Sequence, residues 1–81
     1  MTFTNCNIFP NPVEGILNIQ FENNIKGTKL VMIYNVNGKL LLHKNTQESH
    51  TEIDMSLFTK GIYVLKIQDN EKVIISRIFK D

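Results

Sequence analysis

The sequence lacks several features that would point to a particular chemistry. It has one cysteine, Cys6, so no internal disulfide can form, and it has no tryptophan. It has two prolines, and no apolar run approaches the ~20 residues that a membrane-spanning helix needs. The formal net charge is +1, and the nine basic residues are scattered along the chain. This scatter argues against nucleic-acid binding, which needs basic residues gathered on one face.

The first residues, Met1 to Asn5, also lack the basic start and apolar core of a secretory signal peptide. The protein is therefore either cytoplasmic or a piece of a longer chain whose signal lies elsewhere. The 81 residues predict one domain over 1–81, with 1–6 as a linker or an added start. We expect Cys6 to be a small, half-buried hydrophobic side chain and not a reactive thiol.

The strand predicted over 62–67 organises the chain. Its side chains alternate between two largely apolar faces, so we expect it in the middle of a sheet with something packed on each side. Gly61 indicates a turn or a close backbone approach just before it. Tyr63 has the position of the tyrosine in a tyrosine corner, where the ring packs inside and the hydroxyl bonds to backbone upstream.

Six further segments have strand patterns, and no window longer than two turns has helical periodicity. The predicted strands are 5–9, 16–22, 28–35, 39–44, 51–55, 62–67 and 73–79. Turn residues separate them, including Asn37 and Gly38, which predict a hairpin. The fold class is therefore all-β, an immunoglobulin-like antiparallel β-sandwich of about seven short strands.

Alternation also predicts which side chains face the core. We expect Leu57 to plug the end of the sandwich, and the predicted inward residues of the strands include Leu17, Ile19, Phe21, Thr51, Ile53, Met55, Val73, Ile75 and Phe79.

Catalytic and metal-binding arrangements have little support. His43 and His50 flank a polar loop, but nothing in their spacing demands zinc. Ser56, His50 and Asp54 can be written as a triad, but alternation in a short strand puts His50 and Asp54 on the solvent face. The sequence therefore predicts no enzyme activity and no cofactor in this domain.

Several short motifs, read in order, resemble one known family. They are 8–12 (IFPNP), 33–39 (IYNVNGK), 61–66 (GIYVLK) and the closing strand 72–80. Together they resemble the C-terminal sorting domain of proteins exported by the type IX secretion system. The motif residues are mainly structural, and they are Pro10, Asn11, Pro12, Asn37, Gly38, Lys39, Gly61 and Tyr63.

The resemblance implies a non-catalytic secretion signal that directs a larger cargo protein through an outer-membrane translocon. Its implied partners are translocon components, a sortase-like cysteine protease and an upstream cargo domain, which can itself be an enzyme. No nucleic acid and no transmembrane segment are implied. The domain would pass through the periplasm to the cell surface or medium and be cleaved off. Two residues depart from the family pattern: Asn35 stands where Asp is frequent, and Asp81 follows Lys80.

The last strand is the best candidate for recognition. Lys72, Arg77 and Lys80 place positive charge along it, and its backbone could add to a partner sheet. The same basic residues are equally expected if they protect an exposed edge from aggregation.

Two alternative functions remain at this point. One is an adhesive or spacer module of the immunoglobulin or fibronectin kind. The other is a carbohydrate-binding module, which would need exposed aromatic residues such as Phe3, Phe58 and Phe79.

Overall fold

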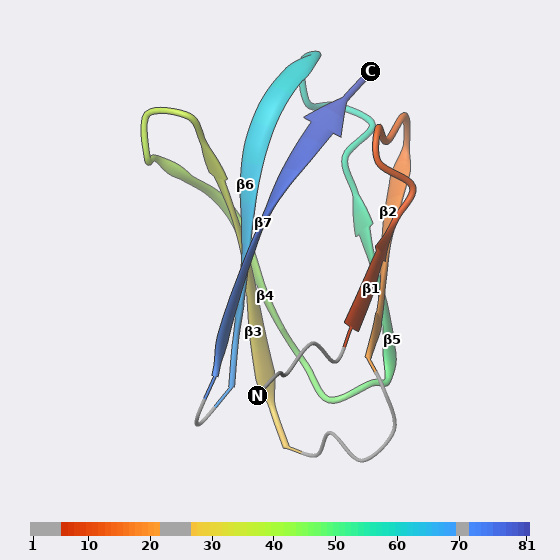
Figure 1. Ribbon diagram of the computed structural model, residues 1–81, viewed down its shortest axis with the longest axis vertical. Coiled ribbons are helices and arrows are strands. Elements are labelled where there is room, and N and C mark those ends of the chain that lie inside the picture. Colours follow the sequence, from red (N-terminus) through yellow and green to blue (C-terminus); the bar gives the residue numbers. More distant parts are fainter. Residues whose placement is uncertain (1–5, 22–26, 70–71) are drawn as a thin grey trace.

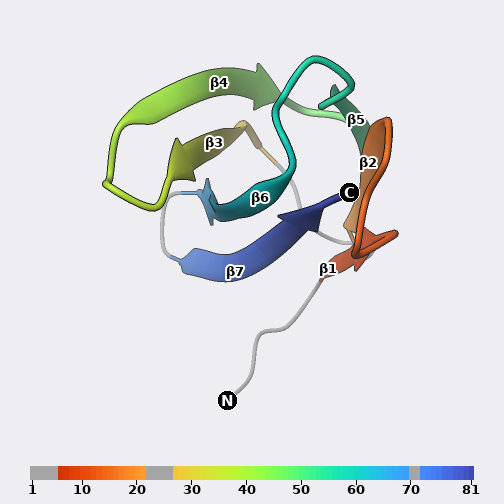
Figure 2. The ribbon, with the colours of Figure 1, turned by 90° about the horizontal axis from the view of Figure 1, so that it is seen from above.

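The computed structural model describes residues 6–21, 27–69 and 72–81, and it has two layers of antiparallel strands (Figure 1). One sheet has the order β1-β2-β5 and the other the order β4-β3-β6-β7, and Figure 2 shows them as separate layers. All seven predicted strands are present: β1 (Cys6–Phe9), β2 (Ile16–Phe21), β3 (Lys29–Asn35), β4 (Leu40–Thr46), β5 (His50–Asp54), β6 (Gly61–Gln68) and β7 (Val73–Lys80). Predictions that fall on 1–5, 22–26 and 70–71, including those on Phe3 and Asn5, lie outside the described residues.

The core lies between the two sheets and is built from alternate strand residues. On β2, Leu17, Ile19 and Phe21 are buried as predicted, and on β5 the same holds for Thr51 and Ile53. The buried side chains form one cluster of Val13, Leu17, Ile19, Phe21, Val31, Ile33, Ile53, Met55, Tyr63, Leu65, Ile67 and Ile78. Both sheets contribute to it, so neither layer is stable without the other.

The inward face of β7 is the opposite of the one predicted. Ile78 is fully buried and Ile74 packs against the core. The residues predicted to be inside are 47%, 65% and 42% exposed, namely Val73, Ile75 and Phe79. Both sets of side chains are apolar, so the alternating pattern predicts a strand but does not say which set faces the core. Pairing with β6 decides which set does, because it puts Ile78 beside the buried Tyr63.

Two other packing predictions were wrong. Leu57 does not plug the sandwich but is 95% exposed at the corner of a turn. Its neighbour Phe58 packs instead, with its ring centroid 5.2 Å from that of Tyr63. The strand β6 does lie inside its sheet, but Ile62 on its outer face is 44% exposed. A two-layer sandwich covers only one face of each sheet.

The tyrosine corner is present as predicted. The Tyr63 hydroxyl donates to the Thr59 carbonyl oxygen at 2.6 Å and lies 3.1 Å from the Thr59 hydroxyl. Gly61 has a φ of 150°, a conformation that side chains rarely adopt. A Cβ at Gly61 would meet nothing within 4 Å, so conformation and not close approach explains this glycine.

The hairpin between β3 and β4 is also confirmed. Gly38 has a φ of 89°, and its N–H donates to the Asn35 carbonyl oxygen at 3.0 Å. The side-chain Oδ1 of Asn35 accepts the N–H groups of Asn37 and Lys39 at 2.9 and 3.0 Å. An aspartate would offer the same acceptor oxygen, so Asn35 keeps the turn that the family pattern builds with Asp.

Candidate recognition surface

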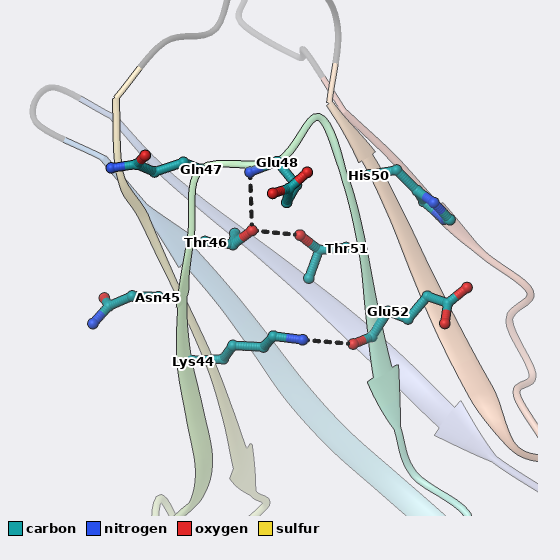
Figure 3. A pocket seen from close by; sticks show the side chains of 8 residues that line it. All are labelled: Lys44, Asn45, Thr46, Gln47, Glu48, His50, Thr51 and Glu52. Carbon is teal, nitrogen blue, oxygen red and sulfur yellow. Dashed lines mark hydrogen bonds between the residues drawn. The ribbon is translucent and has the colours of Figure 1, made fainter.

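An open depression of about 560 Å³ lies between β4 and β5, at the side where the two sheets meet (Figure 3). The Lys44 Nζ donates to the Glu52 carbonyl oxygen at 3.1 Å, and the Thr46 and Thr51 hydroxyls lie 2.8 Å apart. These contacts tie the edge strand of one sheet to that of the other. The depression is lined by Lys44, Asn45, Thr46, Gln47, Glu48, His50, Thr51 and Glu52. Four of these residues, Lys44, Thr46, Thr51 and Glu52, hold the two edge strands together.

The structure does not assemble a catalytic triad from Ser56, His50 and Asp54. His50 points away from Lys44 and Thr46 in Figure 3, and its Nε2 lies 3.0 Å from Asn18 Oδ1. Ser56 sits beyond the other end of β5, where its hydroxyl donates to Asp54 Oδ1 at 2.6 Å. Across the described residues, no group of three or more His, Cys, Asp or Glu side chains is placed to hold a metal ion.

Two titratable groups have pKa values shifted by their surroundings. Hydrogen bonds from the Ser56 hydroxyl and then from its backbone N–H lower the pKa of the Asp54 carboxyl below its ordinary value. Burial raises the pKa of the Cys6 thiol. Cys6 is half-buried against the core, as expected, so little reactive thiolate is present at neutral pH.

The segment 11–13 covers one half of the free edge of β7. Asn11 Nδ2 donates to the Arg77 carbonyl oxygen at 3.0 Å, and Asn11 Oδ1 accepts the Phe79 N–H at 2.8 Å. The Val13 N–H donates to the Phe79 carbonyl oxygen at 2.8 Å, and its carbonyl accepts the Asp81 N–H at 2.9 Å. Three edge groups of β7 and the N–H of Asp81, which follows it, are thereby satisfied without a full strand. We call residues 11–13 the edge cover.

Sequence reasoning missed the edge cover. It gave Pro10, Asn11 and Pro12 only a general structural role, and it did not identify Val13, which is fully buried. A signal was present, because a proline has no N–H to offer a ladder. An asparagine between two prolines can replace that missing donor with its side-chain amide. The motif 10–12 therefore has a specific structural role, which is to close part of an edge 66 residues away.

The three basic candidates for recognition do not share one face. Arg77 is exposed on the outer face of β7, and alternation turns Lys80 to the inner face, where it is 9% exposed. The Lys80 Nζ donates to the Asp81 carbonyl oxygen at 2.9 Å. Lys72 is exposed just before β7, and its backbone N–H donates to Asp69 Oδ1 at 2.8 Å.

The outer face of the four-stranded sheet is apolar and basic. Its exposed apolar side chains include Leu40, Ile62, Val73, Ile75 and Phe79. None of the four strands contains an aspartate or a glutamate. Among the aromatic residues proposed for sugar binding, Phe58 packs against Tyr63, which leaves only Phe79 exposed in the described part of the chain.

These features define a class of protein: an immunoglobulin-like antiparallel β-sandwich. The family described as the secretion system C-terminal sorting domain matches residues 7–81. The chain belongs to this family, and it is a C-terminal sorting signal for secretion of a cargo protein by the type IX system. Among the described residues, no helix has the length and hydropathy to cross a membrane.

One known protein is similar to the chain in sequence, and another is similar in fold. Over 68 residues the chain is 43% identical to a funoran endo-beta-hydrolase of Wenyingzhuangia aestuarii, covering 83% of this chain and 9% of that enzyme. The fold matches PorZ, an essential bacterial surface component of the type-IX secretion system of Porphyromonas gingivalis. That match has a TM-score of 0.75 and 18% identity and covers 94% of this chain and 11% of PorZ, so it shows the fold alone.

Proposed function

We propose that the type IX translocon binds this domain as a folded unit, at the end of a larger precursor. The observation that carries the proposal is the family match over residues 7–81 on a chain that folds as one sandwich. The edge cover near the start of the domain bonds to the last residues of the chain. A translocon that reads the last strand therefore reads a surface that exists only when the domain is folded.

On this proposal, the translocon recognises the side chains of Lys72, Arg77 and Lys80. Arg77 supports it most directly, since its side chain is exposed on the outer face. The test changes all three to glutamine, which keeps hydrogen-bonding capacity and removes the charge. Reduced export of a folded triple variant is expected, because charge complementarity governs the rate of encounter between partners. Normal export would remove charge recognition from the proposal.

The cargo is a secreted enzyme, in line with the relative whose name is funoran endo-beta-hydrolase. The chain spans 9% of that relative, so the remainder of such a protein is available for catalysis. After export, a sortase-like cysteine protease removes the domain, and the cargo stays on the cell surface or enters the medium. Mass spectrometry of the secreted cargo would locate the new C-terminus upstream of the sandwich.

A reporter fusion tests the function directly. A fluorescent protein with an N-terminal export signal is joined to residues 1–81 and expressed in a bacterium that has a type IX system. We expect the reporter outside the cell in that strain and in the periplasm of a strain without the translocon. The reporter without residues 1–81 is the matched control. Equal periplasmic retention with and without the domain would instead favour an adhesive or spacer module.

A further inference from the structure

The free edge of β7 is covered along only half its length. The backbone N–H and C=O groups of β7 alternate in direction: those of the even-numbered residues point toward β6, and those of the odd-numbered residues point to the free edge. The bonds of Arg77 and Phe79 to Asn11 show this direction for the odd-numbered residues. The edge cover takes the groups from the Arg77 carbonyl to the Asp81 N–H. Within the described chain, no strand pairs with the Val73 and Ile75 groups on that side.

Side chains next to this open half are apolar and basic. Ile75 is 65% exposed, the highest value of any large hydrophobic strand residue, and Val73 is 47% exposed. Lys66 on β6 pairs directly with Ile75 and points to the same outer face, where Arg77 also lies. An unpaired, apolar edge strand is an aggregation hazard that proteins normally cover or charge.

We propose that a strand of a translocon protein, with alternating apolar and acidic side chains, pairs with the edge of Val73 to Arg77. This inference rests on the proposed function and says where and how recognition occurs. The partner's backbone would take the free groups of Val73 and Ile75, which is how extended peptides add to sheets. Its apolar side chains would lie beside Ile75, and its carboxylates beside Lys66 and Arg77.

Charge complementarity selects this occupant over a second copy of the chain. Two copies paired through β7 would gather Arg77 and Lys66 of both chains on one continuous outer face, and like charges gathered in this way are unfavourable. The four strands of this sheet carry no carboxylate to offset them. An acidic partner strand meets the same side chains with opposite charge. The edge cover sets the limit of the pairing, since it already occupies the groups beyond the Arg77 N–H.

Three variants of the 1–81 reporter fusion test the proposal. Ile75→Pro removes an N–H that points away from β6, so it blocks strand addition and breaks no β6–β7 bond. Arg77→Glu reverses the charge at the same edge. Leu40→Lys is the matched control, because Leu40 is 43% exposed on β4 at the opposite edge of the same sheet. Circular dichroism in urea establishes that each variant is folded.

We expect about a tenfold fall in exported reporter for Ile75→Pro and for Arg77→Glu, and little change for Leu40→Lys, because one lost charge pair or backbone bond changes affinity by about that factor. If Ile75→Pro does not fold, Arg77→Glu carries the test alone. If the wild-type fusion is exported and both Ile75→Pro and Arg77→Glu are exported equally well, the edge proposal is overturned and the sorting function stays intact. A wild-type fusion that is not exported would overturn both.

Photocrosslinking identifies the occupant. A benzophenone amino acid placed at Ile75 or at Leu40 is activated in cells during export, and the crosslinked peptides are sequenced. We expect an Ile75 adduct to an Asp- or Glu-containing segment of a translocon protein, and a partner Asp→Lys or Glu→Lys change there to restore export of Arg77→Glu. Adducts between two copies of this chain, or equal yields from Leu40, would refute the proposal.

Discussion

Replacing Asn11 with alanine removes both side-chain contacts that hold the edge cover against β7. The variant loses the bond from Nδ2 to the Arg77 carbonyl oxygen at 3.0 Å and the bond from the Phe79 N–H to Oδ1 at 2.8 Å. Each intramolecular hydrogen bond contributes about 0.5–1.5 kcal/mol to the free energy of unfolding. Both bonds lie at an exposed edge, where water replaces the lost partner, so we expect a loss of about 1–2 kcal/mol.

Urea unfolding followed by far-UV circular dichroism measures this loss. A destabilisation of that size should lower the Tm of so small a domain by roughly 4–16 °C. Asn45→Ala is the matched control, since Asn45 is an exposed strand residue whose amide bonds to nothing in the part of the chain that the structure describes. A difference between the two variants of less than about 0.5 kcal/mol, the usual range for surface changes, would refute the edge cover.

Amide hydrogen exchange adds a residue-specific check. The Phe79 N–H is protected by Asn11, whereas neighbouring Ile78 pairs with Tyr63 on β6. In Asn11→Ala we expect faster exchange at Phe79 with Ile78 little changed, because only the first depends on the edge cover. Uniform acceleration at both amides would show global destabilisation and no local role for Asn11.

Tyr63→Phe should cost about 1–2 kcal/mol in urea unfolding, because it leaves the Thr59 carbonyl oxygen without its 2.6 Å bond; an unchanged midpoint would contradict the corner. Gly38→Ala should cost about 1 kcal/mol, since φ is 89° there, and equal stability would mean that the turn has rearranged. Ser56→Ala should raise the pKa of Asp54 toward 3.8 in an NMR titration. Because the pKa of Asp54 is lower in the folded protein than in the unfolded one, the hydrogen bonds from Ser56 stabilise the fold at pH values above the unfolded pKa. This stabilisation is lost as the pH falls through the folded pKa, so the free energies of unfolding of wild type and Ser56→Ala should converge in acid.

Local chemistry made much of the fold predictable. The alternation in β2 and β5 fixed both their strand character and their buried faces, because one face of each is apolar and the other polar. The Asn37–Gly38 hairpin and the Tyr63 corner were likewise predictable, since their bonds join residues no more than four apart. Such contacts depend on short pieces of chain and leave a clear pattern in the sequence.

Predictions failed where two apolar options were equivalent. On β7, either Ile74 and Ile78 or the residues between them could face the core, and only pairing with β6 chose. Leu57 and Phe58 were likewise interchangeable until the ring of Phe58 met Tyr63. Hydrophobicity alone does not say which of two neighbouring apolar side chains is buried.

The sequence by itself determined that this chain forms seven strands in a two-layered sandwich, and its ordered motifs placed it among sorting domains. Only the tertiary structure decided which face of β7 is outside, and that Asn11 and Val13 close half of its edge. The physical reason is distance along the chain. The bonds of Asn11 join residues 66 and 68 positions apart, and no local pattern specifies such a pair until the two sheets have packed.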